Sequence, residues 1–314
     1  MPIDPQARKI LDEGIRLPAL ETLSVAAARK RCRDTFCTKE IPEHVSKVDN
    51  RILSFTVDHA IYNIPVRIYT PGAGPPLPVL VYFHGGGFVV NNLDTHDAIC
   101  RNLANTAGCI VVSVDYARSP EYRYPVALKQ CYRVTTWVAE NATLLGADPF
   151  RIAVGGDSSG GILAAGVSLM GRDLKTPHIS FQLLLYPALD YYLPGTDSYE
   201  KFSAGYSLTR ETMRWFFSLY LPKNFNRNDP YLFPVRAQRH DNLPATHIIT
   251  AQYDPLRDEA ERYAELLEKS GCVVTLKRYA GMIHGFIIMR QTIDMGKKAL
   301  KEAGIVLKNH FTQK

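Results

Sequence analysis

Apolar, β-forming runs that alternate with stretches of helical periodicity are the feature of this chain that most limits its fold. The apolar runs are residues 78–83, 109–114, 151–156, 181–186, 246–252 and 273–279. The helical patterns are residues 96–106, 125–145, 160–173, 256–270 and 291–310. Continuous apolar strands separated by helices are typical of a mostly parallel sheet, because helices then bury both of its faces. We therefore predict an α/β fold.

Two runs of alternating apolar residues, 51–57 and 64–70, precede this series and are separated by a short polar link. Such a pair is typical of an antiparallel hairpin, which brings the predicted number of strands to eight. The chain has 314 residues, of which 46% are hydrophobic and 22% charged, the balance of a globular protein. Because α/β folds often exceed about 200 residues as one unit, we predict a single domain over residues 1–314.

Two segments do not follow this alternation of strand and helix patterns. Residues 1–45 carry one or two short helical patterns without a strand partner. About 60 residues between Tyr186 and Thr246 lack a buried-strand signal, contain a helical pattern over 208–221 and are rich in aromatic side chains. A long insertion of this kind usually has a function, such as a lid over a site. The alternative is that the helix only packs its aromatic side chains into the core.

The charge of the chain excludes some classes of partner. Lys and Arg number 37 and Asp and Glu 31, which leaves a formal net charge of +6. The densest basic groups, in residues 29–33 and 297–301, form no stripe like that of a nucleic-acid-binding protein, so we expect solvated charges and no nucleic-acid partner. No run approaches the roughly 18 apolar residues of a transmembrane segment. The charged N-terminus is unlike a signal peptide, which predicts a cytoplasmic location.

The six cysteines lie mostly within apolar periodic segments, at Cys32, Cys37, Cys100, Cys109, Cys131 and Cys272. Because they are few for the length of the chain, we expect buried free thiols rather than disulfides. No second Cys or His pair at zinc spacing follows Cys32 and Cys37, and neither nucleotide-binding motif is present. We therefore expect no metal and no organic cofactor.

A G-x-S-x-G motif, from Gly156 to Gly160, directly follows one predicted strand and directly precedes a predicted helix. In this setting a serine sits on a sharp turn with its hydroxyl exposed, and the flanking glycines let the two backbones approach. The motif makes Ser158 the candidate nucleophile. Centring it on Ser159 fails, because its first position would then be Asp157. The pentapeptide alone is a weak signal, and its strand-turn-helix setting strengthens it.

The tetrapeptide His84-Gly85-Gly86-Gly87 follows the strand predicted at 78–83. Successive glycines leave amide hydrogens uncovered, so these groups can point at an oxyanion that develops during a reaction. The alternative is a plain glycine-rich turn. A dinucleotide-binding loop is excluded, because the G-x-G-x-x-G spacing is missing. His84 is a candidate for orienting the loop.

A serine nucleophile needs a base, and the base needs a carboxylate that orients it. Asp254 ends the strand predicted at 246–252, and His284 follows the strand predicted at 273–279. Ligands of open α/β sheets bind at the carboxyl ends of the strands, where both residues are expected. Asp258 is the rival acid, although its position favours a role in the first turn of a helix.

Four ordered strings, HGGGFVVNNLDTHDAICR, GDSSGG, DPLRDE and GMIHGF, resemble the hormone-sensitive-lipase-like family of α/β-hydrolase esterases. The resemblance runs from the N-terminal helices to the last helix. It implies a catalytic triad of Ser158, Asp254 and His284, and a helical cap built from residues 1–45 and about 188–225. The implied oxyanion hole consists of the backbone amides of Gly85, Gly86, Gly87 and Ser159.

The sequence departs from the family pattern in two places. Ser159 replaces an alanine of the elbow, a change expected to be mild because only its amide should donate. Arg118 lies one place away from the arginine of the family's Asp-Tyr-Arg segment, which puts its supporting contacts in doubt. Gibberellin receptors resemble the family but lack a functioning histidine; since His284 is present, an enzyme is favoured over a receptor.

The expected activity is that of a serine carboxylesterase, which hydrolyses small-molecule esters of short to medium chain length through an acyl-enzyme. The same residues could serve an amidase, a deacetylase or a thioesterase, and the residues alone do not separate these reactions. A ligand-binding relative without turnover is a further alternative. The last strand, 273–279, is a candidate edge for pairing into a homodimer.

Overall fold

A computed structural model describes residues 1–37, 42–57, 60–72, 74 and 76–312 of the chain. In these residues eight strands form one sheet in the order β1-β2-β4-β3-β5-β6-β7-β8. The strands are β1 (Lys47–Val57), β2 (Ala60–Thr70), β3 (Leu77–Phe83), β4 (Ile110–Val114), β5 (Ala147–Asp157), β6 (Phe181–Leu185), β7 (Ala245–Tyr253) and β8 (Val274–Ile283). β2 pairs antiparallel with β1 and β4, and the other neighbours are parallel. The predicted α/β fold with an opening hairpin is confirmed.

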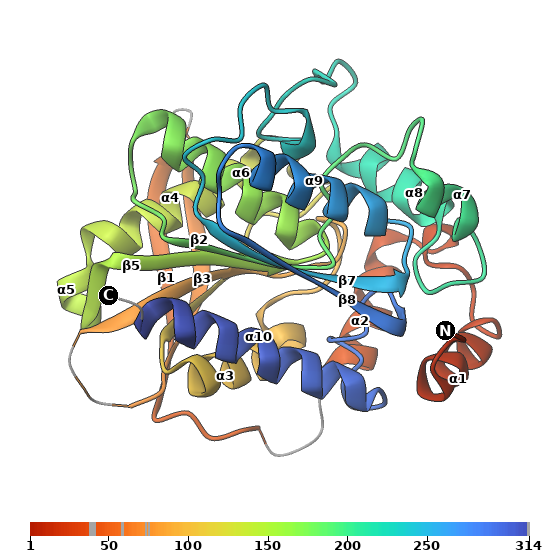
Figure 1. Cartoon of the computed structure of the whole chain (residues 1–314), viewed down its shortest axis with the longest axis horizontal. Coiled ribbons are helices and arrows are strands. Elements are labelled where there is room, and N and C mark those ends of the chain that lie inside the picture. The colour runs from red at the N-terminus through yellow and green to blue at the C-terminus, as the bar shows by residue number, and fades with distance from the viewer. Residues whose placement is uncertain (38–41, 58–59, 73, 75, 313–314) are drawn as a thin grey trace.

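Helices cover both faces of the sheet (Figure 1). One face carries α4 (Val126–Glu140), α6 (Ser159–Leu174) and α9 (Arg257–Lys269). The other face carries α3 (Leu93–Ala107) and α10 (Asp294–Thr312). The helix predicted over 125–145 is divided into α4 and the short α5 (Ala142–Leu145), because Asn141 leaves the helical conformation and caps α4 by donating to the Trp137 carbonyl.

The central strands β3, β4 and β6 are buried almost throughout because helices pack on both faces of the sheet there, whereas much of β8 is exposed. In β3, Val79 and Val81 belong to the core under α4 and α6, whereas Leu80 and Tyr82 belong to the core on the opposite face. This alternation follows from the two-residue period of a strand. The resulting sandwich of two helical layers around the sheet places the carboxyl ends of the parallel strands along one edge of the molecule.

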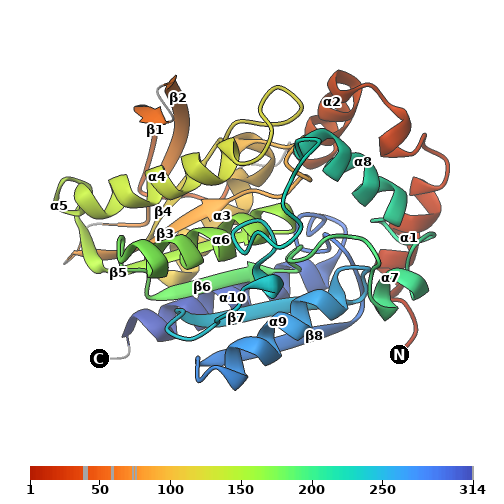
Figure 2. The ribbon, with the colours of Figure 1, turned by 90° about the horizontal axis from the view of Figure 1, so that it is seen from above.

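The 3-10 helix η2 (Pro234–Arg236) packs against α9, and the other remaining helices gather at that edge (Figure 2). They are α1 (Pro5–Gly14), the 3-10 helix η1 (Leu20–Thr22), α2 (Val25–Phe36), α7 (Asp197–Lys201) and α8 (Arg210–Tyr220). The N-terminal segment meets α8, since the Thr212 hydroxyl donates to Glu21 at 2.9 Å. α1 instead joins the core beneath β8, where Ala7 and Leu11 pack among residues of β8 and α10.

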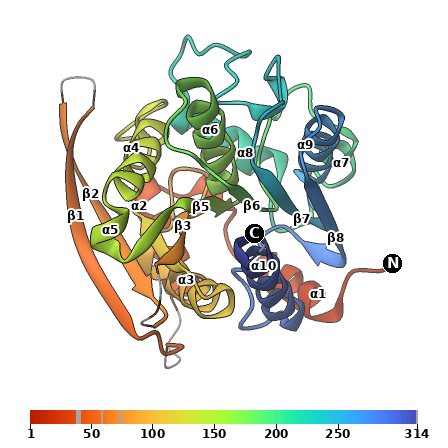
Figure 3. The same ribbon diagram turned by 60° about the vertical axis from the view of Figure 1, so that its left-hand side comes forward.

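Two further observations concern the surface and the thiols. All six cysteines are free; four are buried as expected, whereas Cys37 and Cys272 are only half-buried. None of the helices in the described ranges is both long enough and apolar enough to cross a membrane. β1 and β8 form the two edges of the sheet, at opposite sides of the molecule (Figure 3).

Candidate active site

Ser158 lies at the turn between β5 and α6, where its backbone adopts φ +53° and ψ −118°. Two glycines make this tight turn feasible. A Cβ at Gly156 would lie 2.5 Å from the backbone of Gly160, and a Cβ at Gly160 would lie 1.9 Å from the Phe83 carbonyl oxygen. Only glycine permits such close approach. The strained backbone at Ser158 lifts its hydroxyl clear of the strand and the helix.

Three side chains from different strand ends meet at this turn. The Nε2 atom of His284, directly after β8, lies 2.9 Å from Ser158 Oγ. The Nδ1 atom of the same ring lies 2.7 Å from Oδ2 of Asp254, directly after β7. A carboxylate can only accept, so Nδ1 carries the hydrogen and Nε2 is left to accept from the serine hydroxyl. The structure thus brings Ser158, His284 and Asp254 together as one hydrogen-bonded chain.

Asp254, the carboxylate that contacts His284, is fully buried, and neighbouring groups hold both it and the imidazole in place. Asp254 is 0% exposed, and its second carboxylate oxygen accepts from the Leu256 amide at 2.8 Å. The ring of Tyr186 packs edge-on against the His284 ring, with 5.1 Å between centroids. These contacts leave the imidazole little freedom to rotate away from Ser158.

Asp258, the alternative candidate for the acid, contacts Ser198 instead of His284. Its Oδ2 accepts from the amide of Ser198 at 2.7 Å, and the Ser198 hydroxyl accepts from the Asp258 amide at 3.3 Å. Asp258 therefore ties the start of α7 to the start of α9, rather than only supporting its own helix. It is not the carboxylate that contacts His284.

The glycine loop between β3 and α3 faces Ser158. Gly86 and Gly87 have φ values of +123° and +58°, which side-chain-bearing residues adopt at a cost. Their amide hydrogens have no acceptor within the described part of the chain, and the same holds for Ser159 at the start of α6. The prediction for Gly85 is wrong, because its amide donates to Asp157 Oδ1 at 2.9 Å and so serves the framework of the loop.

Asp157 holds the glycine loop in place through the Gly85 amide. Its buried carboxylate also accepts from the Tyr82 hydroxyl at 2.9 Å and faces His96 Nε2 at 3.1 Å. Burial opposes ionisation of Asp157, but His96 and the hydrogen bonds from Tyr82 and Gly85 outweigh it, so that its pKa lies below the ordinary value. An ionised carboxylate directly before Ser158 therefore holds the first peptide of the glycine loop.

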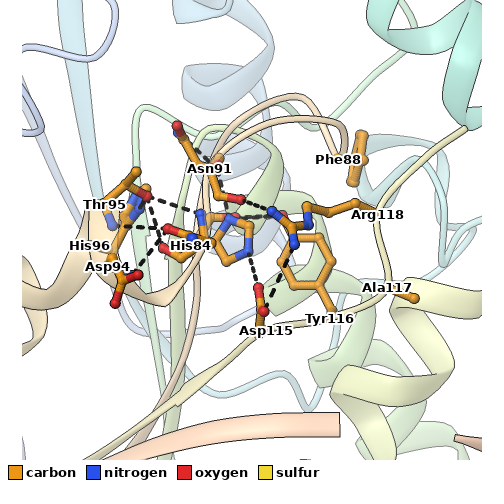
Figure 4. A network of polar contacts seen from close by, with 12 residues as sticks. His84, Phe88, Asn91, Asp94, Thr95, His96, Asp115, Tyr116, Ala117 and Arg118 are labelled. Carbon is orange, nitrogen blue, oxygen red and sulfur yellow. Dashed lines mark hydrogen bonds and ion pairs between the residues drawn. The ribbon is translucent and has the colours of Figure 1, made fainter. Parts of the chain in front are cut away.

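His84 supports the same loop from the other side (Figure 4). Its ring stacks on Tyr116 with 4.4 Å between centroids, and the Tyr116 hydroxyl donates to the His84 carbonyl at 2.6 Å. Burial lowers the pKa of His84, which keeps the imidazole neutral near pH 7. Nδ1 lies 2.8 Å from the Gly85 carbonyl and must carry the hydrogen, since a carbonyl only accepts.

A narrow apolar cavity of about 20 Å³ opens next to Ser158. It is lined by Gly87, Phe88, Ser158, Ser159, Ala188, Leu208, Met213, Phe216 and Phe217. α8 contributes the wall opposite the glycine loop. The Phe216 ring lies directly on Gly87, where a Cβ would come within 2.1 Å of it. This volume exceeds slightly what one water molecule needs, so the cavity is small.

Sequence reasoning missed two residues of the site. Arg29, interpreted as a solvated charge, donates from Nε to the Val89 carbonyl at 2.8 Å and forms a two-pronged ion pair with Glu121. α2 is thereby joined to the glycine loop. Asn91, which contacts Gly85, was also missed. An Asn in a glycine-rich loop is a signal for left-handed backbone, but its partner could not be deduced from the sequence.

The hydroxyl of Ser159, expected to be without a role, accepts from the Phe88 amide at 3.3 Å and so adds one contact to the loop. Arg118, whose contacts were in doubt, donates to the Asn91 carbonyl at 2.7 Å. No group of three or more His, Cys, Asp or Glu side chains in the described residues is arranged to hold a metal ion. The arrangement is that of a hydroxyl activated by an imidazole, opposite uncovered amides.

Comparison with known proteins agrees with this geometry. A family model described as the α/β-hydrolase fold matches residues 80–288. The chain is 36% identical over 312 residues to esterase LipI of Mycobacterium tuberculosis, covering 98% of this chain and 94% of LipI.

Solved structures show the same likeness. An ester-hydrolase from the metagenome of Lake Arreo, in complex with a bipyridine phosphonate derivative, is 37% identical with a TM-score of 0.92, covering 99% of this chain and 100% of that one. A hyperthermophilic esterase from Pyrobaculum calidifontis is 36% identical with a TM-score of 0.91, over 98% and 99% of the two chains. Full-length similarity at this identity, together with the assembled motifs, shows that the chain belongs to the hormone-sensitive-lipase-like family of α/β-hydrolases and is a carboxylic ester hydrolase of the serine type.

Proposed function

We propose that this chain hydrolyses small esters of short to medium chain length through an acyl-enzyme formed on Ser158. The observation that carries the proposal is the hydrogen-bonded chain from Ser158 through His284 to Asp254, at 2.9 and 2.7 Å. Ser158 Oγ attacks the ester carbonyl carbon while His284 Nε2 takes its proton. Asp254 holds the imidazole in the required tautomer and stabilises the cation that forms.

The amides of Gly86, Gly87 and Ser159 receive the developing oxyanion in this mechanism. They are uncovered, and they lie in a largely apolar setting where hydrogen bonds to charge are strong. When the tetrahedral intermediate collapses, the carbon–oxygen bond to the alcohol breaks and His284 donates its proton to the leaving oxygen. Water then attacks the acyl group by the same route, and the acid leaves as Ser158 regains its hydrogen.

The small cavity supports a preference for short acyl chains. Phe216, Met213 and Leu208 close it from the side of the cap segment, and a chain longer than a few carbons would require them to move. We infer that residues 1–45 and 188–225 act as this cap. We expect acetyl and butanoyl esters of nitrophenol to be hydrolysed faster than the hexadecanoyl ester. A reversed order would contradict the proposed pocket.

The test of the mechanism is Ser158→Ala, which removes the nucleophile and leaves the turn intact. Turnover of nitrophenyl esters should fall by several orders of magnitude, while the circular dichroism spectrum and Tm stay near those of the native chain. A fluorophosphonate should label the native protein at Ser158. Absence of labelling would favour the ligand-binding alternative, and faster turnover of matched amides or thioesters would favour the other reaction classes.

A further inference from the structure

The directions of the oxyanion-hole amides are set by what holds the carbonyls of the glycine loop. In a planar trans peptide the C=O and the N–H point in opposite directions. The donors to the Gly85 carbonyl therefore aim the Gly86 amide, and the donors to the Gly86 carbonyl aim the Gly87 amide. Gly86 O accepts from the backbone amides of Val89 and Val90 at 3.0 and 2.9 Å, so the loop itself aims Gly87.

The Gly85 carbonyl is held by side chains instead. His84 Nδ1 lies 2.8 Å from it, and Asn91 Nδ2 donates to it at 3.2 Å. Asn91 is 6% exposed, and within the described residues its carboxamide has no other hydrogen bond, since its Oδ1 is buried without a partner. The side chain of Asn91 is therefore committed to the one peptide that carries the Gly86 amide.

The backbone of Asn91 is strained in order to reach that peptide. Its φ is +67°, in the left-handed region, which Asn tolerates better than most side chains but which only glycine adopts freely. Arg118 holds this conformation through the 2.7 Å hydrogen bond from its Nη1 to the Asn91 carbonyl. The Asp115 carboxylate lies 3.9 Å from Arg118 Nη2 and so helps to place the guanidinium that holds Asn91 (Figure 4).

We propose that Asn91 is a positioning residue of the oxyanion hole, whose carboxamide holds the Gly85–Gly86 peptide so that the Gly86 amide faces the oxyanion, and that Arg118 holds Asn91 in place. The proposal rests on the hole function of Gly86 proposed above. A residue with a purely structural role at this φ would be served better by glycine, whereas positioning requires the amide donor that glycine lacks.

The decisive variant is Asn91→Gly, because the two roles predict opposite results for it. It relieves the strained backbone, so Tm should be equal or higher. It also removes the Nδ2 donor, so kcat for nitrophenyl acetate should fall about tenfold, less than the 10²–10³ typical of losing a hole donor itself. KM should stay nearly unchanged, since the ester carbonyl in the ground state carries little charge.

The affinity for a trifluoromethyl ketone is a second measurement, and a purely structural role of Asn91 would not change it. Ser158 Oγ adds to its carbonyl carbon, His284 takes the proton, and the adduct places an oxyanion in the hole. Its affinity should fall in Asn91→Gly by the same factor as kcat/KM. Binding of the product alcohol, which forms no oxyanion, should not change.

Two further variants complete the test. Asn242→Gly is the matched control, because Asn242 is an exposed turn residue with φ +56°, and it should keep native kcat. Asn91→Asp keeps the side-chain shape but cannot donate, so it should be at least as slow as Asn91→Gly. It also keeps the proposal testable if Asn91→Gly fails to fold.

Native kcat and native ketone affinity in Asn91→Gly or in Asn91→Asp would overturn the proposal. If the native chain does not hydrolyse esters, or if Ser158→Ala remains fully active, the proposed function itself fails. The two failures are therefore distinguishable.

Discussion

Strained backbone is concentrated around Ser158, the proposed nucleophile. Four non-glycine residues with positive φ lie in or beside the site: Phe88, Asn91, Ser158 and Tyr186. Each such residue costs free energy and persists only where its surroundings hold it. In this protein the surroundings are the packed carboxyl ends of the strands, which hold the reacting groups in place before substrate arrives.

At Gly87, both the backbone conformation and the packing of Phe216 disfavour a side chain. Gly87→Ala should lower both Tm and kcat/KM, because φ +58° disfavours a side chain and the new Cβ would meet the Phe216 ring. Combining it with Phe216→Ala should recover part of the Tm loss by removing the collision, while the backbone strain remains. Full additivity of the two losses, measured as a double-mutant cycle, would contradict this contact.

His247 on β7 should make the fold sensitive to acid. Burial lowers its pKa to about 4, whereas an unfolded chain takes up the proton near pH 6.5. The unfolded state then binds more protons between these values, so the free energy of unfolding should fall as pH drops from about 6.5 to about 4, by an amount on the order of 3 kcal/mol.

His247→Gln should flatten this part of the stability curve, measured by urea unfolding at a series of pH values. His178→Gln, at an exposed histidine, serves as the control and should leave the slope as it is in the native chain. Equal slopes in the native protein and His247→Gln would show that other groups cause the acid sensitivity.

At the scale of elements, α8 decides how much room the substrate finds. Its buried face presents Met213, Phe216 and Phe217 to the cavity, while Glu211 and Arg214 point to solvent. The helical pattern over 208–221 predicted the helix and left open whether the segment forms a lid or only packs its aromatic side chains into the core. That the Phe216 ring lies on Gly87 could not be deduced, because it depends on how the insertion folds back over the sheet.

Phe216→Ala should shift the acyl preference towards longer chains. Removing the ring opens the cavity above Gly87, so kcat/KM for the octanoyl ester should rise relative to the acetyl ester by about tenfold, the effect of a methylene or two in an apolar pocket. Leu219→Ala, on the same helix but outside the cavity lining, is the control for lost apolar volume. An unchanged ratio would mean that Phe216 does not limit acyl length.

For the whole molecule, the open edge of β8 is the surface to test for self-association. Leu276 on this strand is 41% exposed, and Val273, directly before the strand, is 71% exposed. An unprotected edge strand can pair with a second copy. We expect a dimer in sedimentation equilibrium, and we expect Leu276→Glu to weaken it while kcat stays near the native value.

Leu144→Glu adds the same charge at a site that is 81% exposed on α5, and it should leave the dimer intact. A monomeric native chain, or a dimer that is insensitive to Leu276→Glu, would contradict pairing through β8.

The sequence by itself determined the strands, most helices, the family, and the residue types and order of Ser158, Asp254 and His284. Hydrophobic periodicity and glycine-flanked turns are local properties, so they can be deduced from neighbouring residues. The tertiary structure alone showed that Asp258 contacts Ser198, that the Gly85 amide donates to Asp157, and that Asn91, Arg118 and Phe216 lie at the glycine loop. Those outcomes depend on contacts between residues far apart in the chain, which only the packing of the sheet and of the helices around it brings close together.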